Sequence, residues 1–177
     1  MANVKNEVQD ALKTIDFEKN TYALTFETSM GTINLEFFPD LAPGHCKNMI
    51  ALAKVGFYDN VTFHRIVPGF VIQGGCPDGT GMGGPGYTIE AEFNESPHLP
   101  GVLSMARTND PNSAGSQFFL CLEKVPYLDN QYTVFGKTTD EESLSVVKAI
   151  GAVKTGAQDK PIEDVVIKKA TVTESSK

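Results

Sequence analysis

The chain has 177 residues, which is enough for one domain with a single core. Its formal net charge is −7 and its lysines form no basic stripe, so we expect neither nucleic acid nor an anionic membrane as a partner. The three cysteines, Cys46, Cys76 and Cys121, are an odd number without CxxC spacing, which argues against a disulfide framework and a structural metal site. The N-terminal segment has no apolar stretch of the secretory type, and we expect a cytoplasmic monomer.

Two patterns divide the start of the chain. Apolar residues recur at helical spacing over 3–15, whereas from Tyr22 the period changes to two. We therefore expect a helix over 3–15 and an antiparallel hairpin over 22–38 with its turn at 29–31. This divides the chain into an N-terminal helical extension (1–20) and one domain (21–177). The extension either packs on the domain, mediates self-association or is disordered.

The rest of the domain reads as short strands with two helices. A helix of about 12 residues is expected from Pro43, which suits a first helical turn, to Gly56, which suits a C-terminal cap. A second is expected over 140–150, with acidic residues in its first turn. Gly-, Pro- and Asn-rich connections separate the apolar runs at 61–67, 69–75, 102–106, 116–122, 132–137 and 164–172. The pattern is mainly β and favours a closed barrel of about eight strands with its ends covered.

Two motifs suggest chemistry, but their contexts do not support it. The segment GTGMGG at 79–84 matches a dinucleotide fingerprint, yet a strand-like run follows it where a helix is required. We expect a tightly turned glycine loop there. Ser116 does not lie in a nucleophile elbow, and none of the three histidines has an obvious spacing to a serine or a carboxylate. Strand alternation predicts that His64 and Arg65 point to opposite faces.

Arginine is the informative residue type. The chain has thirteen lysines but only two arginines, Arg65 and Arg107, and Arg65 lies among β residues and phenylalanines. An arginine at such a position indicates a function that requires a permanently charged, planar fork of donors. Alternation places Gln117 and Phe119 on one strand face. Together with Arg65 and the nearby run 70–73, this predicts an apolar pocket with a few polar groups; a core with satisfied polar residues is the alternative.

The segments FHRIVPGFVIQGG, LSMAR, GSQFFLCL and YLDNQYTVFGK resemble, in order and spacing, the signature segments of cyclophilins. The resemblance runs from about residue 22 to 172. It implies a closed eight-stranded antiparallel β-barrel capped by two α-helices, with a substrate groove on the outer surface. It also implies a peptidyl-prolyl cis–trans isomerase that needs no cofactor or metal, binds proline-containing peptides and unfolded or folding proteins, and assists protein folding.

The resemblance also implies roles for particular residues. The catalytic set would comprise Arg65, which stabilises the twisted amide, together with Phe70, Gln73, Phe119 and Tyr132. The substrate-binding set would be completed by Val71, Gly81, Ala106, Arg107, Thr108, Gln117, Tyr127 and Leu128. An apolar floor would bury the proline ring, and 106–108 would form the rim that pairs with the substrate backbone.

The chain departs from the common eukaryotic pattern at four of these positions. Val71 replaces methionine, Tyr127 replaces tryptophan, Tyr132 replaces histidine and Arg107 replaces asparagine. The tryptophan supplies a hydrogen bond to cyclosporin-like ligands, so we expect Tyr127 to weaken their binding.

Two other functions stay open from the sequence. A barrel of this type could hold proline-containing segments as an adaptor or chaperone, with isomerisation incidental. An unrelated small-molecule-binding barrel is the other.

Overall fold

The computed structural model describes residues 4–177. In that part of the chain, nine strands and three α-helices follow one another, with two short 3₁₀ helices. The strands are β1 (Asn20–Thr28), β2 (Gly31–Phe37), β3 (Val61–Thr62), β4 (Arg65–Val67), β5 (Val71–Gly74), β6 (Val102–Met105), β7 (Phe118–Cys121), β8 (Val134–Thr138) and β9 (Val166–Ser176). The helices are α1 (Val4–Leu12), α2 (Pro43–Lys54), η1 (Pro126–Leu128), α3 (Glu141–Gly151) and η2 (Ala157–Asp159).

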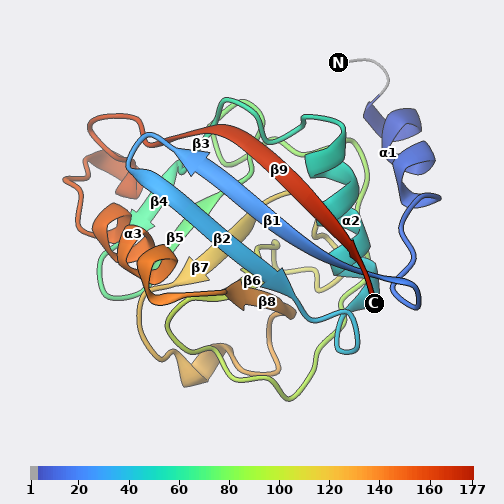
Figure 1. Ribbon diagram of the computed structural model, residues 1–177. Helices are drawn as coiled ribbons and strands as arrows, with labels where there is room; N and C mark the ends of the chain where they lie inside the picture. The colour runs from blue at the N-terminus through green and yellow to red at the C-terminus, as the bar shows by residue number, and fades with distance from the viewer. Residues whose placement is uncertain (1–3) are drawn as a thin grey trace.

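All nine strands form one strongly curled antiparallel sheet, in the order β3-β9-β1-β2-β8-β6-β7-β5-β4 (Figure 1). The two edge strands, β3 and β4, are only two residues apart in the chain. The run 61–67, expected as one strand, is therefore split: its first part pairs with β9 and its second with β5. At the break Phe63 is fully buried and donates its N–H to the Val165 carbonyl. The mainly β fold is confirmed, with nine strands where eight were expected.

Strand alternation gives the sheet two buried faces. The inner face holds the main core, where Phe118 of β7 stacks on Phe26 with ring centroids 5.4 Å apart. The opposite face of the same strands carries a second, smaller cluster around Phe119 and Val71, which are 4% and 2% exposed. Because successive residues of a strand point to opposite faces, one strand can serve both clusters.

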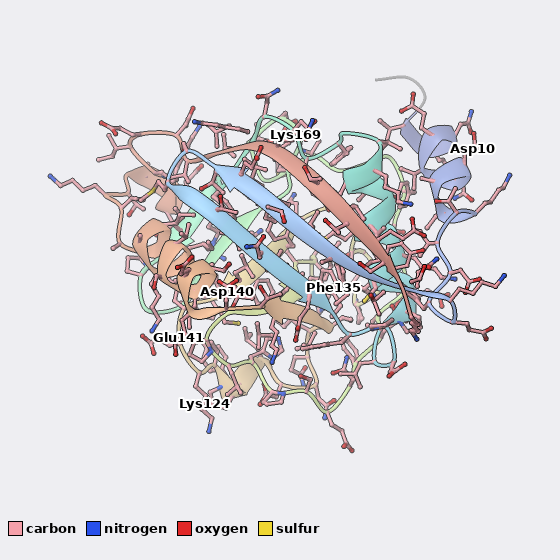
Figure 2. The ribbon with its side chains drawn as sticks, viewed as in Figure 1. Asp10, Lys124, Phe135, Asp140, Glu141 and Lys169 are labelled. Carbon is pink, nitrogen blue, oxygen red and sulfur yellow. The ribbon has the colours of Figure 1, made fainter. Side chains whose placement is uncertain are left out.

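Helices α2 and α3 lie at opposite ends of the curled sheet (Figure 1). Asp140 caps α3 by accepting the Ser143 N–H at 2.7 Å, and Glu141 follows it in the first turn, where the helix dipole favours acidic residues (Figure 2). Gly56 follows the end of α2 with a φ of 78°, a conformation that glycine adopts without strain.

The cap of α2 comes from a distant part of the chain. The residue before the helix, Ala42, has no capping side chain, and Pro43 opens the first turn. Glu92 instead accepts the backbone N–H groups of Gly44 at 3.1 Å and His45 at 2.7 Å, and its Oε1 lies 2.6 Å from His45 Nδ1. A carboxylate satisfies the free N–H groups there and complements the dipole.

The N-terminal helix α1 packs against α2 through Val8, which is 1% exposed. It begins at Val4, and position 3 of the expected helix lies outside the described residues. Of the three arrangements open from the sequence, the structure shows docking. No helix within residues 4–177 combines the length and the apolar character that crossing a membrane requires.

Candidate active site

The site is built on one row of paired residues that crosses four neighbouring strands. Arg65 of β4 is paired with Gln73 of β5, which is paired with Phe119 of β7, which is paired with Ser104 of β6. Residues directly opposite in a sheet share a face, so the four side chains project from the outer face in a line. The charge, the amide and the aromatic ring are thus side by side because of the register.

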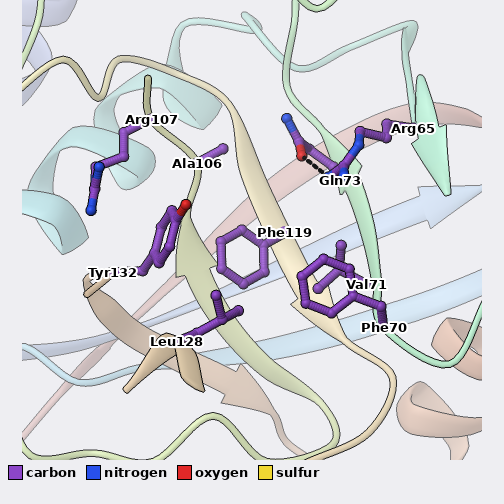
Figure 3. Close-up of a pocket in the computed structure, with 9 residues that line it drawn as sticks. All are labelled: Arg65, Phe70, Val71, Gln73, Ala106, Arg107, Phe119, Leu128 and Tyr132. Atoms are coloured by element: carbon purple, nitrogen blue, oxygen red, sulfur yellow. Dashed lines mark hydrogen bonds between the residues drawn. The ribbon is translucent and has the colours of Figure 1, made fainter. Parts of the chain in front are cut away.

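Nine of the thirteen predicted site residues surround a hollow of about 180 Å³ at this row (Figure 3). They come from β4, the turn between β4 and β5, β5, the segment after β6, β7, η1 and the turn before β8: Arg65, Phe70, Val71, Gln73, Ala106, Arg107, Phe119, Leu128 and Tyr132. Gly81, Thr108 and Gln117 line a neighbouring hollow of about 570 Å³ that shares three residues with the first. Tyr127 lines neither; it is 69% exposed and stacks on Phe70 with centroids 6.0 Å apart.

The floor of the hollow is apolar and closely packed. Phe119 packs edge-on against Tyr132, with ring centroids 5.7 Å apart, and Leu128 is 8% exposed beside it. A half-open apolar floor of this size fits a small ring and gains free energy by removing it from water.

A chain of hydrogen bonds orients the polar wall. Gln117 Nε2 donates to the carbonyls of Gly81 at 2.9 Å and Gly83 at 3.0 Å, which turns its Oε1 toward Gln73. Gln73 Nε2 donates to that oxygen at 3.2 Å, and its own Oε1 accepts from Arg65 Nη1 at 3.2 Å. Both amide orientations follow from these partners. The guanidinium is therefore held by a relay that begins in the glycine loop.

The glycine loop is itself fixed by Cys76. The buried Cys76 sulfur accepts the N–H groups of Gly81 and Gly83, each at 3.2 Å, and donates to Asp78 Oδ1 at 2.9 Å. Hydrogen bonds from Cys76 and Thr80 lower the pKa of Asp78 to about 2. No helix opens at the end of this loop among the described residues, and the structure agrees with a tightly turned loop.

A buried polar network lies beneath the floor, and the sequence analysis missed it. The His98 ring stacks on Phe119 at 6.0 Å, its Nδ1 lies 2.9 Å from Asp129 Oδ1, and its Nε2 lies 2.9 Å from Ser104 Oγ. Burial lowers the pKa of His98, against the opposing effect of Asp129, so the ring is neutral. Ser104 Oγ, which donates its proton to the Thr133 carbonyl, lies between that carbonyl and Nε2.

This network has the residue types of a hydrolytic triad but not its access. Ser104 is completely buried below Phe119, and its Oγ also lies 3.0 Å from the Thr133 carbonyl. A substrate carbonyl has no path to that oxygen, so the geometry supports a positioning role for the aromatic floor and not nucleophilic attack. The three residues are 6 to 31 positions apart in sequence, and no local motif predicts that they meet.

The expectation that His64 and Arg65 point to opposite faces rested on strand alternation, but His64 lies in the break between β3 and β4, so it stays a prediction. His64 and Arg65 both line a hollow of about 420 Å³ beside the glycine loop. His64 is 8% exposed, and its Nδ1 has no hydrogen-bond partner within residues 4–177.

Comparison with known proteins identifies this arrangement. The model of the family "Cyclophilin type peptidyl-prolyl cis-trans isomerase/CLD" matches residues 23–172. The chain belongs to this family. A peptidyl-prolyl cis-trans isomerase of Synechococcus elongatus is 55% identical over 124 residues, which cover 70% of this chain and 85% of that protein. One of Helicobacter pylori is 46% identical over 150 residues, which cover 81% and 91%.

Solved structures agree with the family assignment. The crystal structure of a cyclophilin type peptidyl-prolyl cis-trans isomerase from Cryptosporidium parvum matches with a TM-score of 0.80 and 35% identity, over 86% of this cyclophilin and 98% of that chain. A second crystal structure of that protein, in the presence of the dipeptide ala-pro, matches with a TM-score of 0.79. This cyclophilin is a peptidyl-prolyl cis–trans isomerase.

Proposed function

We propose that Arg65 is the catalytic residue of this isomerase and that the Phe119 floor holds the proline ring. The observation that carries this proposal is the relay from Gln117 through Gln73, which aims a permanently charged fork of donors across an apolar hollow. Arg65 and Phe119 flank Gln73 in one row of the sheet, so a proline on the ring brings its peptide bond beside the guanidinium.

The chemistry needs a donor and no bond to be broken. Resonance in the amide raises the rotational barrier to about 18–20 kcal/mol, and uncatalysed X–Pro exchange takes tens to hundreds of seconds. When the bond twists, the nitrogen regains its lone pair and becomes a better acceptor. A donor aimed at that nitrogen lowers the energy of the twisted state more than that of the planar state, which is the condition for catalysis.

The floor supplies grip and selection. Burying an apolar ring against Phe119, Val71 and Leu128 contributes about 1.5–3 kcal/mol, enough to select proline while peptide affinity stays weak. Tyr132 closes one side with its ring. The presence of an Ala-Pro dipeptide with the Cryptosporidium parvum relative supports a proline-containing peptide as the ligand of this groove. We extend this to unfolded and folding proteins, whose proline isomers limit folding.

We further propose that residues 21–177 form the isomerase domain and that 1–20 are an extension which stabilises it through α2. In this proposal the protein works as a cytoplasmic monomer, where its three buried free cysteines stay reduced. It would bind cyclosporin-like ligands weakly, because Tyr127 replaces the tryptophan of other members.

The test of the catalytic role is exchange NMR on a short proline peptide with wild-type protein, Arg65→Ala and Arg65→Lys. We expect kcat/KM to fall about 100-fold or more in Arg65→Ala, the scale seen when a preorganised transition-state donor is removed. Arg65→Lys keeps a charge without the planar fork and should recover only part of the rate. Thermal unfolding checks that the fold is intact, since Arg65 is a half-buried groove residue.

Rapid exchange that survives in folded Arg65→Ala would overturn this role. Peptide binding without faster exchange in wild type would instead make the groove a docking site. The protein would then be an adaptor that holds proline-containing segments.

A further inference from the structure

The second arginine of the chain occupies a distinctive place in the groove. Arg107 lines both the proline hollow and the neighbouring larger hollow. Figure 3 shows Arg65 and Arg107 on opposite sides of Phe119, so the two guanidinium groups flank the floor. These are the only arginines in the sequence, and both lie at this site.

The Arg107 side chain is held in place by neutral groups. Its Cζ lies 4.5 Å from the centroid of the Tyr132 ring, within the range of a cation–π contact. Nε and Nη2 both donate to the Gln131 carbonyl, and Nη1 donates to the Thr108 carbonyl at 2.8 Å. A guanidinium has five N–H donors, so one on each terminal nitrogen is left without a partner within residues 4–177.

Neither arginine forms an ion pair within residues 4–177, although Asp78 lines the hollow of about 420 Å³ that Arg65 also lines. Among the described residues, no aspartate or glutamate lines the proline hollow or the neighbouring larger hollow. The closest acidic residue along the chain, Asp110, accepts the Asn112 N–H at 2.9 Å in its own turn. A protein of net charge −7 thus presents in its groove two arginines that have no ion-pair partner within residues 4–177, and Arg107 lines no hollow with a carboxylate.

From this arrangement we propose that Arg107 is a specificity-determining residue, and that this cyclophilin prefers proline segments with a carboxylate side chain near the proline. The inference rests on the proposed placement of the proline ring on Phe119. Two free N–H groups on a pre-positioned planar fork match the two oxygens of a carboxylate, and the Tyr132 stack reduces the entropy lost on binding.

The distances limit where that carboxylate is in the substrate. The contacts from Phe119 to Tyr132 and from Tyr132 to Arg107 put the guanidinium within about 10 Å of the floor ring, or about three residues of extended chain at about 3.3 Å each. A glutamate or aspartate one or two residues from the proline therefore reaches Arg107 through its own side chain.

The experiment uses pairs of proline peptides. The two members of a pair differ only in carrying Glu or Gln at one position, which is one or two residues before the proline or one or two residues after it. Exchange NMR gives kcat/KM for both members of each pair, and the readout is their ratio within one protein. For wild type we expect kcat/KM to be about five times higher for the Glu peptide than for the Gln peptide at one or more of these positions. This is the range of a charged contact at a half-exposed site. Added salt should lower the ratio.

Two variants assign the preference. Arg107→Gln should bring the ratio to about one, and Arg107→Lys should keep part of it, because lysine retains the charge but loses the fork. Lys169→Gln is the matched control: it removes one positive charge from the exposed face of β9, away from the groove (Figure 2), and should leave the ratio and the neutral-peptide rate unchanged.

The outcomes separate this inference from the proposed function. Equal rates for Glu and Gln peptides in an active wild-type enzyme would overturn the acidic preference alone. A ratio that persists in Arg107→Gln would assign the preference to another residue and overturn the role of Arg107. If wild type accelerated no peptide, the proposed function itself would fail.

Discussion

The two faces of β7 bury aromatic rings in different surroundings. On the inner face, Phe118 is fully buried among Phe26, Tyr58 and Phe63, and every neighbour in this set is a ring of the main core. On the outer face, Phe119 has a histidine network behind it and an open hollow in front. The same strand thus supports a core that is closed on all sides and a floor that is left open. Adjacent residues with the same side chain should therefore differ in what their removal does.

The largest expected effect on stability comes from the inner ring. Phe118→Ala should lower the free energy of unfolding by about 3–5 kcal/mol, because the surrounding rings cannot collapse into the space. Urea denaturation measures this, with Phe118→Leu as a milder control. A loss no greater than that of Phe119→Ala would show that the two faces are packed alike.

A smaller loss of stability, with a larger loss of activity, is expected from the outer ring. Phe119→Ala should cost about 2 kcal/mol, since water from the hollow can fill part of the space. Its kcat/KM should fall at least about tenfold, because the proline ring loses its floor. An unchanged melting temperature would mean that His98 and Tyr132 do not hold Phe119 as the structure shows.

Acidification should weaken the outer face through His98. Burial lowers the pKa of His98 below its ordinary value of 6.5, so the unfolded chain takes up a proton before the native one does. The contribution of neutral His98 to the free energy of unfolding is thus fully present above pH 6.5 and is lost as the pH falls toward the native pKa. Replacing this histidine, as in His98→Gln, should reduce the slope of stability against pH by up to about 1.4 kcal/mol per pH unit.

Melting curves between pH 7 and pH 5 test this prediction. A residual slope should persist in His98→Gln, because burial also lowers the pKa of His45 and His64. An identical slope in wild type and variant would exclude His98 as a contributor.

The smallest effect concerns a residue at the margin of the outer face. Tyr127→Trp should tighten binding of a cyclosporin-like ligand about three- to tenfold, because an indole N–H donor replaces the phenol O–H. Stability should not change, because the side chain is 69% exposed. Titration calorimetry measures the affinity, and an unaltered affinity would contradict the assumed role of this position.

The sequence predicted most of this fold because its signals are local. Alternation over 22–38 predicted the hairpin, and Gly56 and the acidic start of 140–150 predicted helix ends to within a few residues. The split of 61–67 could not be predicted, since it depends on β9 and β5 pairing with two halves of one short run. The same holds for the α2 cap, which comes from Glu92, 47 residues from His45.

The site shows the same division. Arg65, Gln73 and Phe119 lie on three strands and are neighbours through the sheet register. The resemblance of their motifs to a known family predicted that they form one site. His98, Ser104 and Asp129 have no such local pattern, and only the folded chain brings them under the floor. Sequence reasoning therefore found the residues around the hollow that we propose as the proline site, but not the polar network packed against Phe119.

The break at residues 63–64 also bears on aggregation. An open sheet exposes a row of unpaired N–H and C=O groups at each edge, where strands of other chains can add. Here the edge strands have only two and three residues, and the chain itself joins them. Beyond the two residues that pair with β3, the free side of β9 has no strand partner within residues 4–177; there β9 contacts α2, and Asp59 accepts the Ala170 N–H at 3.0 Å, so part of this longer edge is occupied without a further strand.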